Sequence, residues 1–154
     1  MRSAAARRAA PLCLHLLLAS GLAAADLTGF WIGTIAQRGR TFAKDVAFQF
    51  VQEGAALGGK AYNDRGSSDA ILRGSVDGGR VAFEVEALEQ GGNEINIVVY
   101  KFRGTVAGEE IELTRERAAL RNAANGTEIP VRRKGDSDEQ DRERRFRSFR
   151  LGRL

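Results

Sequence analysis

Apolar and polar residues alternate in short runs over most of this chain. The clearest run is 80–86, in which Val81, Phe83 and Val85 alternate with polar or small residues. Alternation with period two, β-branched and aromatic residues, and turn residues between the runs are typical of antiparallel strands. The pattern predicts strands at 29–36, 42–51, 57–62, 70–76, 80–86, 94–106, 109–115 and 127–134.

The links between these runs are mostly short, which favours an all-β, antiparallel up-and-down barrel of about eight strands. The alternative is a β-sandwich, but Greek-key sandwiches usually need a long crossing connection. Gly33, Gly59, Gly74 and Gly104 lie inside the runs, where glycine suits the bends of a tightly curved sheet. The Ala-rich stretch 116–124 predicts a short helix between the last two strands.

The two ends of the chain differ from this central region. Residues 1–25 combine a basic start, an apolar run and small residues before Asp26, which is the order of a secretory signal peptide. The apolar run is too short to span a membrane as a helix, and no later stretch is apolar enough to do so, so no transmembrane segment is expected in the mature chain. We therefore predict export to the periplasm or the extracellular space, a barrel domain over 26–134, and a charged, disordered basic tail over 135–154.

Composition excludes several chemistries. The only cysteine, Cys13, and the only histidine, His15, lie in the predicted signal peptide. The mature chain then has no Cys–His or Ser–His–Asp site and no zinc site built from Cys or His. The oxygen-rich turn 63–69 could hold Ca²⁺ weakly, but an Asx-type turn explains it better. We predict no metal and no cofactor.

Two pairs of carboxylates share a strand face. Glu84 and Glu86 are separated by Val85, and a similar pair occupies the strand at 109–115. Two carboxylates at such spacing are what glycoside hydrolysis requires. Because Val85 is the expected inward residue, however, both glutamates should face solvent. The pattern therefore argues against catalysis by this pair.

The start of the first strand carries a resemblance. Gly29, Phe30 and Trp31 form a G-x-W sequence similar to that of the calycin group, which includes lipocalins, fatty-acid-binding proteins and avidins. The chain as a whole resembles small exported bacterial lipocalin-like proteins. The resemblance implies that Trp31 closes one end of the barrel and packs against a basic residue near the last strand, Arg132 or Arg133, in a cation–π contact.

A small barrel either fills its interior with side chains or holds one small ligand. The candidate inward residues would line a cavity for an apolar guest or, alternatively, form a filled core; they are Trp31, Phe48, Phe50, Leu72, Phe83, Val85, Ile97 and Val99. The tail places arginines among apolar residues, which would suit an anionic envelope surface; these are Arg144, Arg145, Arg147, Arg150 and Arg153.

These features lead to three functional hypotheses. The first is an exported, non-enzymatic barrel that binds a small apolar ligand or an envelope component. The second is an enzyme that uses a glutamate, Tyr62 or Tyr100 inside the cavity, which inward carboxylates with a raised pKa would favour. The third is an interaction module with a filled barrel and a surface-binding tail. Export argues against a nucleic-acid partner in each case.

Overall fold

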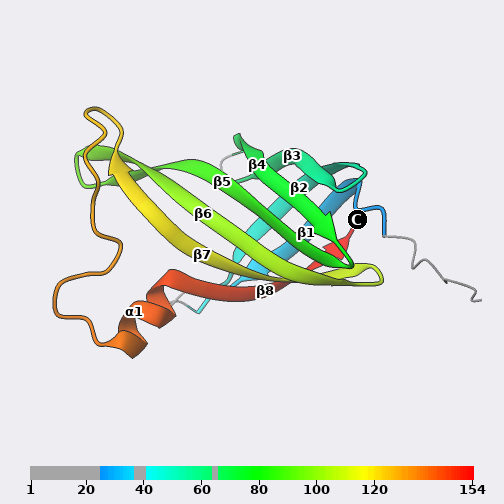
Figure 1. The fold of residues 1–154 in the computed structure, drawn as a ribbon. Helices are drawn as coiled ribbons and strands as arrows, with labels where there is room; N and C mark the ends of the chain where they lie inside the picture. The colour runs from blue at the N-terminus through cyan, green and yellow to red at the C-terminus, as the bar shows by residue number, and fades with distance from the viewer. Residues whose placement is uncertain (1–24, 37–40, 64–65) are drawn as a thin grey trace, which may run out of the picture.

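The computed structural model describes residues 25–36, 41–63 and 66–154. Eight antiparallel strands pair with their neighbours in chain order, and the first pairs with the last, which closes the barrel (Figure 1). This confirms the predicted architecture. The elements are β1 (Gly29–Ile35), β2 (Lys44–Glu53), β3 (Ala56–Tyr62), β4 (Ser68–Asp77), β5 (Arg80–Gly91), β6 (Glu94–Ala107), β7 (Glu110–Asn122), α1 (Asp138–Arg145) and β8 (Phe146–Arg153). The predicted signal peptide lies outside the described residues except for Ala25.

The strand that closes the barrel is not the predicted one. In residues 127–134 the only strand-like pairing is an isolated bridge between Arg121 and Glu128. Residues Phe146–Arg153, which were assigned to a disordered tail, instead form β8 and pair with both β7 and β1. Phe149 and Leu151 are buried in the barrel interior. Removing these apolar side chains from water stabilises the segment as a strand of the barrel.

The predicted helix is also displaced. The Ala-rich stretch belongs to β7, which pairs with β6 as far as Asn122 with one register shift near Tyr100. Hydrogen bonding to a neighbouring strand has here overridden a high helix propensity. A short helix between the last two strands does exist, but it is α1. Ser137 and Gln140 form a capping box at its N-terminus.

Close backbone approaches explain the glycines inside the strands. A Cβ at Gly104 would lie 1.9 Å from the carbonyl oxygen of Glu112, and one at Gly59 would lie 1.8 Å from that of Gln49. Gly33 and Gly74 meet equally close carbonyl oxygens on their neighbouring strands, at 2.2 and 1.9 Å. All four predicted bend positions therefore exclude any larger residue.

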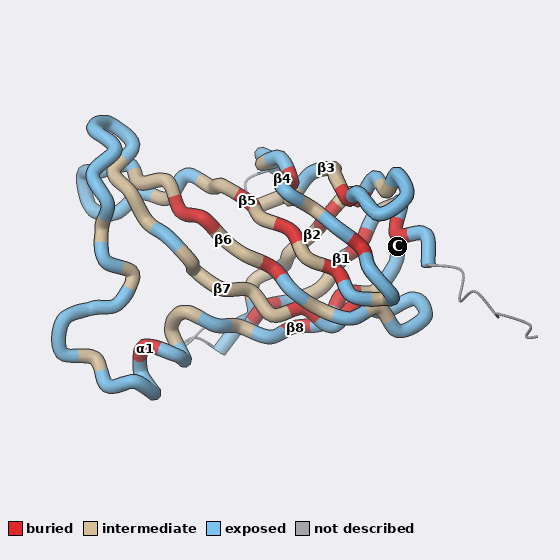
Figure 2. Tube along the Cα trace, in the orientation of Figure 1, coloured by how far each residue is buried: buried red, intermediate tan, exposed pale blue. Residues whose placement is uncertain are grey.

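The interior is filled at one end of the barrel and open at the other. Trp31 and Leu27 are fully buried at the end where the chain enters β1. Trp31 Nε1 donates a hydrogen bond of 2.8 Å to the carbonyl of Leu27. Figure 2 shows most buried positions along the middle and this end of the strands, with a further buried stretch on β6 nearer the far end, and the far ends of β5, β6 and β7 project beyond the others. We call the first the closed end and the second the open end.

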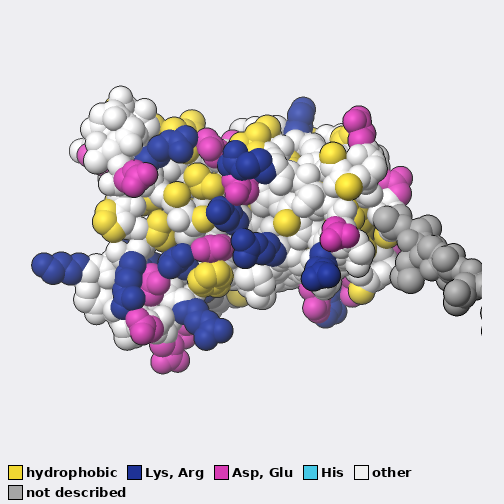
Figure 3. All heavy atoms as spheres, in the orientation of Figure 1, with side chains coloured by type: hydrophobic (Ala, Val, Ile, Leu, Met, Phe, Trp, Pro, Cys, Tyr) yellow, Lys and Arg dark blue, Asp and Glu magenta, His cyan; other side chains and the backbone are white. Residues whose placement is uncertain are grey.

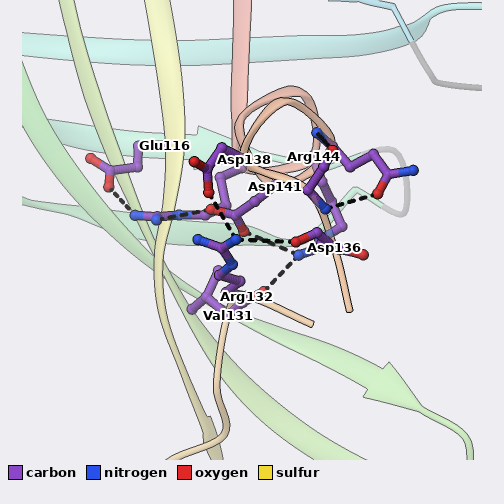
Figure 4. Close-up of polar contacts among 10 residues, drawn as sticks. Glu116, Val131, Arg132, Asp136, Asp138, Asp141 and Arg144 are labelled. Carbon is purple, nitrogen blue, oxygen red and sulfur yellow. Dashed lines mark hydrogen bonds and ion pairs between the residues drawn. The ribbon is translucent and has the colours of Figure 1, made fainter. Parts of the chain in front are cut away.

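Charged side chains attach α1 to the barrel wall (Figure 4). Asp141 is only 8% exposed and lies within ion-pair distance of both Arg144 and Arg145. Arg145 in turn contacts Glu116 on β7, with 2.9 Å between Nη2 and Oε1, and Arg144 contacts Asp136 in the preceding loop. The segment that leads into β8 is therefore held by ion pairs.

Candidate functional site

A cavity of about 660 Å³ occupies the open end of the barrel. Its apolar side is formed by Phe48, Val85 and Phe102, which belong to three different strands. Cavities of roughly 300–1,000 Å³ are the usual size for small-molecule sites. The space is therefore large enough for a ligand, and its deepest wall is apolar.

Below the cavity, phenylalanines fill the closed half. The Phe83 and Phe102 rings stack with centroids 4.6 Å apart, and Phe48 meets both rings edge-on at 5.4 and 5.5 Å. Phe50 packs beneath them beside Trp31. The two options left open by the sequence therefore occur together, because one half of this barrel is filled and the other half is hollow.

On β5 and β7 the inward positions change from apolar to charged as the strand approaches the open end. On β7, Ile111 and Leu113 are buried, and the next inward residue is Arg115, which lines the cavity. On β5, the inward row passes from Val85 through Ala87 to Glu89. This gradient gives the cavity an apolar base and a polar rim.

Tyr100 and Glu89 form a neutralised group on one side of the cavity. The Tyr100 hydroxyl donates a hydrogen bond to Glu89, whose other carboxylate oxygen lies 2.9 Å from Arg117 Nη2. Burial, with the adjacent Glu89 carboxylate, raises the pKa of Tyr100 to about 12. Tyr100 is therefore a neutral phenol at physiological pH, and the charge of Glu89 is balanced by Arg117.

The charge of Arg115 is not balanced by an ion pair of the kind that joins Glu89 to Arg117. Its guanidinium carbon lies 4.6 Å above the centre of the Tyr100 ring, and its Nε is buried without a hydrogen-bond partner. Within the described part of the chain, no carboxylate lies within ion-pair distance of it. Burial lowers the pKa of Arg115, yet an arginine stays protonated in a protein. Arg115 therefore adds a positive charge with an unused donor to a wall that also carries Lys44, Asp45, Asp69 and Glu89.

Asp69 lines the cavity from β4, a strand that does not neighbour β7. Burial raises the pKa of this carboxyl. Arg115 is not among the charges that influence it, so the two groups do not form a pair. Asp69 is the cavity carboxylate that most resembles the raised-pKa group expected of an enzyme.

The structure separates the predicted inward residues into three groups. Phe48 and Val85 line the open cavity, whereas Trp31, Phe50 and Phe83 fill the closed half. Leu72 pairs with Glu84 and Ile97 with Leu88, so the inward orientation predicted for these two residues is wrong. Val99 is buried, but it pairs with Glu86 and lies outside the main core cluster.

Sequence reasoning missed Arg115, Glu89 and Asp69. Period-two alternation does continue from Ile111 and Leu113 to Arg115, so a signal was present. It was overlooked because the strand was ended at Arg115 and the residues after it were assigned to a helix. Tyr100 was named only for the enzymatic alternative.

A basic residue covers Trp31, but it is neither of the two predicted. The guanidinium carbon of Arg153 lies 4.9 Å from the centre of the Trp31 ring. Arg132 instead lies 2.8 Å from Asp138 beside α1, and Arg133 is exposed in the loop before it. A cation–π contact between Trp31 and a basic residue of the last strand is therefore present, as the resemblance implied. The basic residue is Arg153 because the last strand, β8, begins later in the chain than predicted.

The remaining arginines of the predicted tail have partners within the protein. Arg144 and Arg145 hold α1, and Arg150 lies within 4 Å of Glu110 and Glu112 on the outer wall. Arg147 is on the inner row of β8. These side chains are parts of the barrel wall, and binding of an envelope surface by them stays a prediction.

Ion pairs also occupy the outer-wall carboxylates. Glu84 accepts hydrogen bonds from Arg73, which lower its pKa, and Glu86 lies 3.0 Å from Arg121. Figure 3 shows basic and acidic side chains next to one another over this face. These glutamates face solvent as predicted.

Among the described residues, no group of His, Cys, Asp and Glu side chains could hold a metal ion. Within the same residues, no helix has the length and apolar character needed to cross a membrane. No family model, curated protein or solved structure matches this chain. The site must therefore be interpreted from its own geometry.

Proposed function

We propose that this protein is an exported, non-enzymatic binding protein whose open cavity holds a small amphipathic molecule with an acid group. The observation that supports this most directly is Arg115, a cavity-lining cation with a buried Nε that has no partner. A buried donor without a partner costs free energy, roughly 1–3 kcal/mol. A ligand oxyanion would satisfy the donor and the charge together.

The apolar part of the ligand would rest on Phe48, Val85 and Phe102. Aromatic and aliphatic walls of this kind bury hydrocarbon at about 25 cal/mol per Å² of area removed from water. The expected ligand therefore combines a short hydrocarbon or aromatic body with one acidic end.

Binding can be tested with two probes that differ only in the head group, octanoate and octanol. Isothermal titration should give saturable binding of octanoate at one molecule per chain and weaker binding of octanol. Arg115→Met should remove most of the advantage of octanoate, on the order of tenfold in affinity. Arg150→Met, on the outer wall, is the matched control and should leave both affinities unchanged. Absence of binding for both probes to a folded protein would refute the proposal.

Export is supported by the composition of residues 1–25. It is tested by the intact mass of the protein recovered from its native host. A chain that begins at Asp26 is the expected result, and a chain that retains Met1 and the apolar run would contradict export.

An enzyme is a second candidate, and Asp69 is the observation that favours it. A carboxyl with a raised pKa beside a cavity is a frequent feature of general acids and bases. Turnover of p-nitrophenyl esters or glycosides that disappears in Asp69→Asn would support this candidate over simple binding.

A further inference from the structure

The pairing of β7 with β8 places two arginines side by side on the inner face. Arg115 and Arg147 are directly opposed in the register of these strands. The next inward pair toward the closed end is Leu113 and Phe149, and both are buried. Arg147 therefore belongs to the same inward row as Arg115, although of the two only Arg115 lines the cavity.

Within the residues that the structure describes, neither guanidinium of this pair lies within ion-pair distance of a carboxylate, although the charge of Glu89 acts on Arg115 from farther away. In the described part of the chain, Arg147 donates only to main-chain carbonyls, those of Glu143 and Phe146. Arg115 lies over the Tyr100 ring with its Nε unsatisfied. Burial is the main cause of the lowered pKa of Arg115; the charges of Tyr100 and Glu89 act to raise this pKa, and the nearby charge of Arg147 acts to lower it.

Neighbouring arginines behave differently. Arg117 is paired with Glu89, and Arg145 is paired with Glu116. Like charges directly opposite each other on adjacent strands destabilise a sheet, so a pair without carboxylates is costly to keep. Beside the cavity, therefore, two arginines lie together without a carboxylate in ion-pair contact, and the hydrogen bonds of Arg147 go to main-chain carbonyls.

We propose that Arg115 and Arg147 together bind a doubly charged acid group of the phosphate monoester type. This rests on the proposed function, because it specifies the head group of the same ligand. A carboxylate carries one charge and satisfies one guanidinium, whereas a phosphate monoester carries almost two charges and three acceptor oxygens at neutral pH. Planar guanidinium groups match phosphate oxygens in bidentate geometry.

Such a group could be free inorganic phosphate or the end of an apolar molecule. The apolar wall formed by Phe48, Val85 and Phe102 favours the second source. The test therefore compares octyl phosphate, octanoate, octanol and inorganic phosphate by isothermal titration at about pH 8, where the phosphate group is a dianion.

We expect octyl phosphate to bind about tenfold more tightly than octanoate, and inorganic phosphate to bind more weakly than octyl phosphate. Arg147→Met should bring the ratio between octyl phosphate and octanoate close to one and leave the affinity for octanol unchanged. Arg150→Met is the matched control, because Arg150 lies on the outer face of the same strand, β8. This variant should leave the ratio unchanged. Thermal unfolding of each variant checks that the barrel is intact.

Four outcomes would overturn either this assignment or part of the proposed function. Equal binding of octyl phosphate and octanoate, or an undiminished ratio in Arg147→Met, would overturn the role of the pair while leaving the proposed function in place. Failure of every octyl compound to bind would overturn both. Tight binding of inorganic phosphate that is lost in Arg147→Met would support the pair as a phosphate site and refute the apolar part of the proposed function.

Discussion

The closed and open ends of this barrel are built from the same strands, but they differ in whether their buried polar atoms have hydrogen-bond partners. At the closed end, Trp31 has no exposed surface and its only polar atom, Nε1, is hydrogen-bonded. At the open end, Arg115 occupies an inward position with a buried donor that no group satisfies. The comparison teaches that the first region is organised for stability, whereas the second keeps a buried donor without a partner, which costs free energy.

The largest expected difference between the ends concerns their aromatic residues. Trp31→Ala should lower the free energy of unfolding by about 4 kcal/mol, since a fully buried large side chain leaves a cavity in a filled core. Tyr100→Ala, in the wall of an existing cavity, should cost about half as much. Denaturant unfolding measures both changes, and equal losses would contradict the division into a filled and a hollow half.

Backbone contact should give the next largest effect. Gly104→Ala would push a methyl group into the carbonyl oxygen of Glu112, and we expect a loss of about 3 kcal/mol. Gly152→Ala is the matched control because a Cβ there meets nothing within 4 Å. Thermal unfolding of the two variants should differ clearly, and similar midpoints would show that the strands can separate at little cost.

The ion pairs that hold α1 should contribute less. Asp141→Ala leaves Arg144 and Arg145 without their shared buried carboxylate, and we expect a loss of about 2 kcal/mol. Asp138→Ala, whose side chain is 92% exposed, should change stability by less than about 0.5 kcal/mol. If both variants unfolded at the same denaturant concentration, the network would not be what attaches this helix.

Alkaline pH should weaken the open end through Tyr100. Its pKa is raised to about 12 in the folded protein, whereas the unfolded phenol ionises near pH 10. The folded state therefore holds its proton more tightly, and stability is unaffected below pH 10 and falls by up to about 1.4 kcal/mol per pH unit between 10 and 12. In Tyr100→Phe this loss should be absent from the pH dependence of denaturant unfolding.

The smallest expected effect is a gain in stability instead of a loss. Arg115→Met replaces an unneutralised cation with an apolar side chain, and we expect the free energy of unfolding to rise by up to about 1 kcal/mol. The same variant should lose its preference for acidic ligands. A clear loss of stability would mean that Arg115 is a structural residue, and the contrast between the two ends would then need revision.

Much of the barrel could be predicted from local pattern. The alternation of Val81, Phe83 and Val85 is a property of the strand itself, and the structure confirms that all three are buried. The interior glycines could be predicted for the same reason, since a curved sheet needs positions without a Cβ. Leu72 was misplaced because the pairing of β4 with β5 shifts register between this residue and Ser75, which a strict period of two does not anticipate.

The candidate site was harder to predict because it depends on pairing between distant segments. Nothing local to Phe146–Arg153 distinguishes a charged tail from a closing strand, since its arginines and apolar residues suit both. Its structure depends on Ile111 and Leu113 of β7, which supply the surface that Leu151 and Phe149 bury. Without that pairing, Arg147 could not be placed opposite Arg115.

By itself the sequence determined the period of the strands, the place of the first seven and the bend positions, because alternation and the absence of a Cβ act within a few residues of the chain. Only the tertiary structure decided which segment closes the barrel, which arginine covers Trp31 and which cations meet at the open end. Those outcomes depend on burial and charge shared between strands far apart in sequence, and no single segment contains that information.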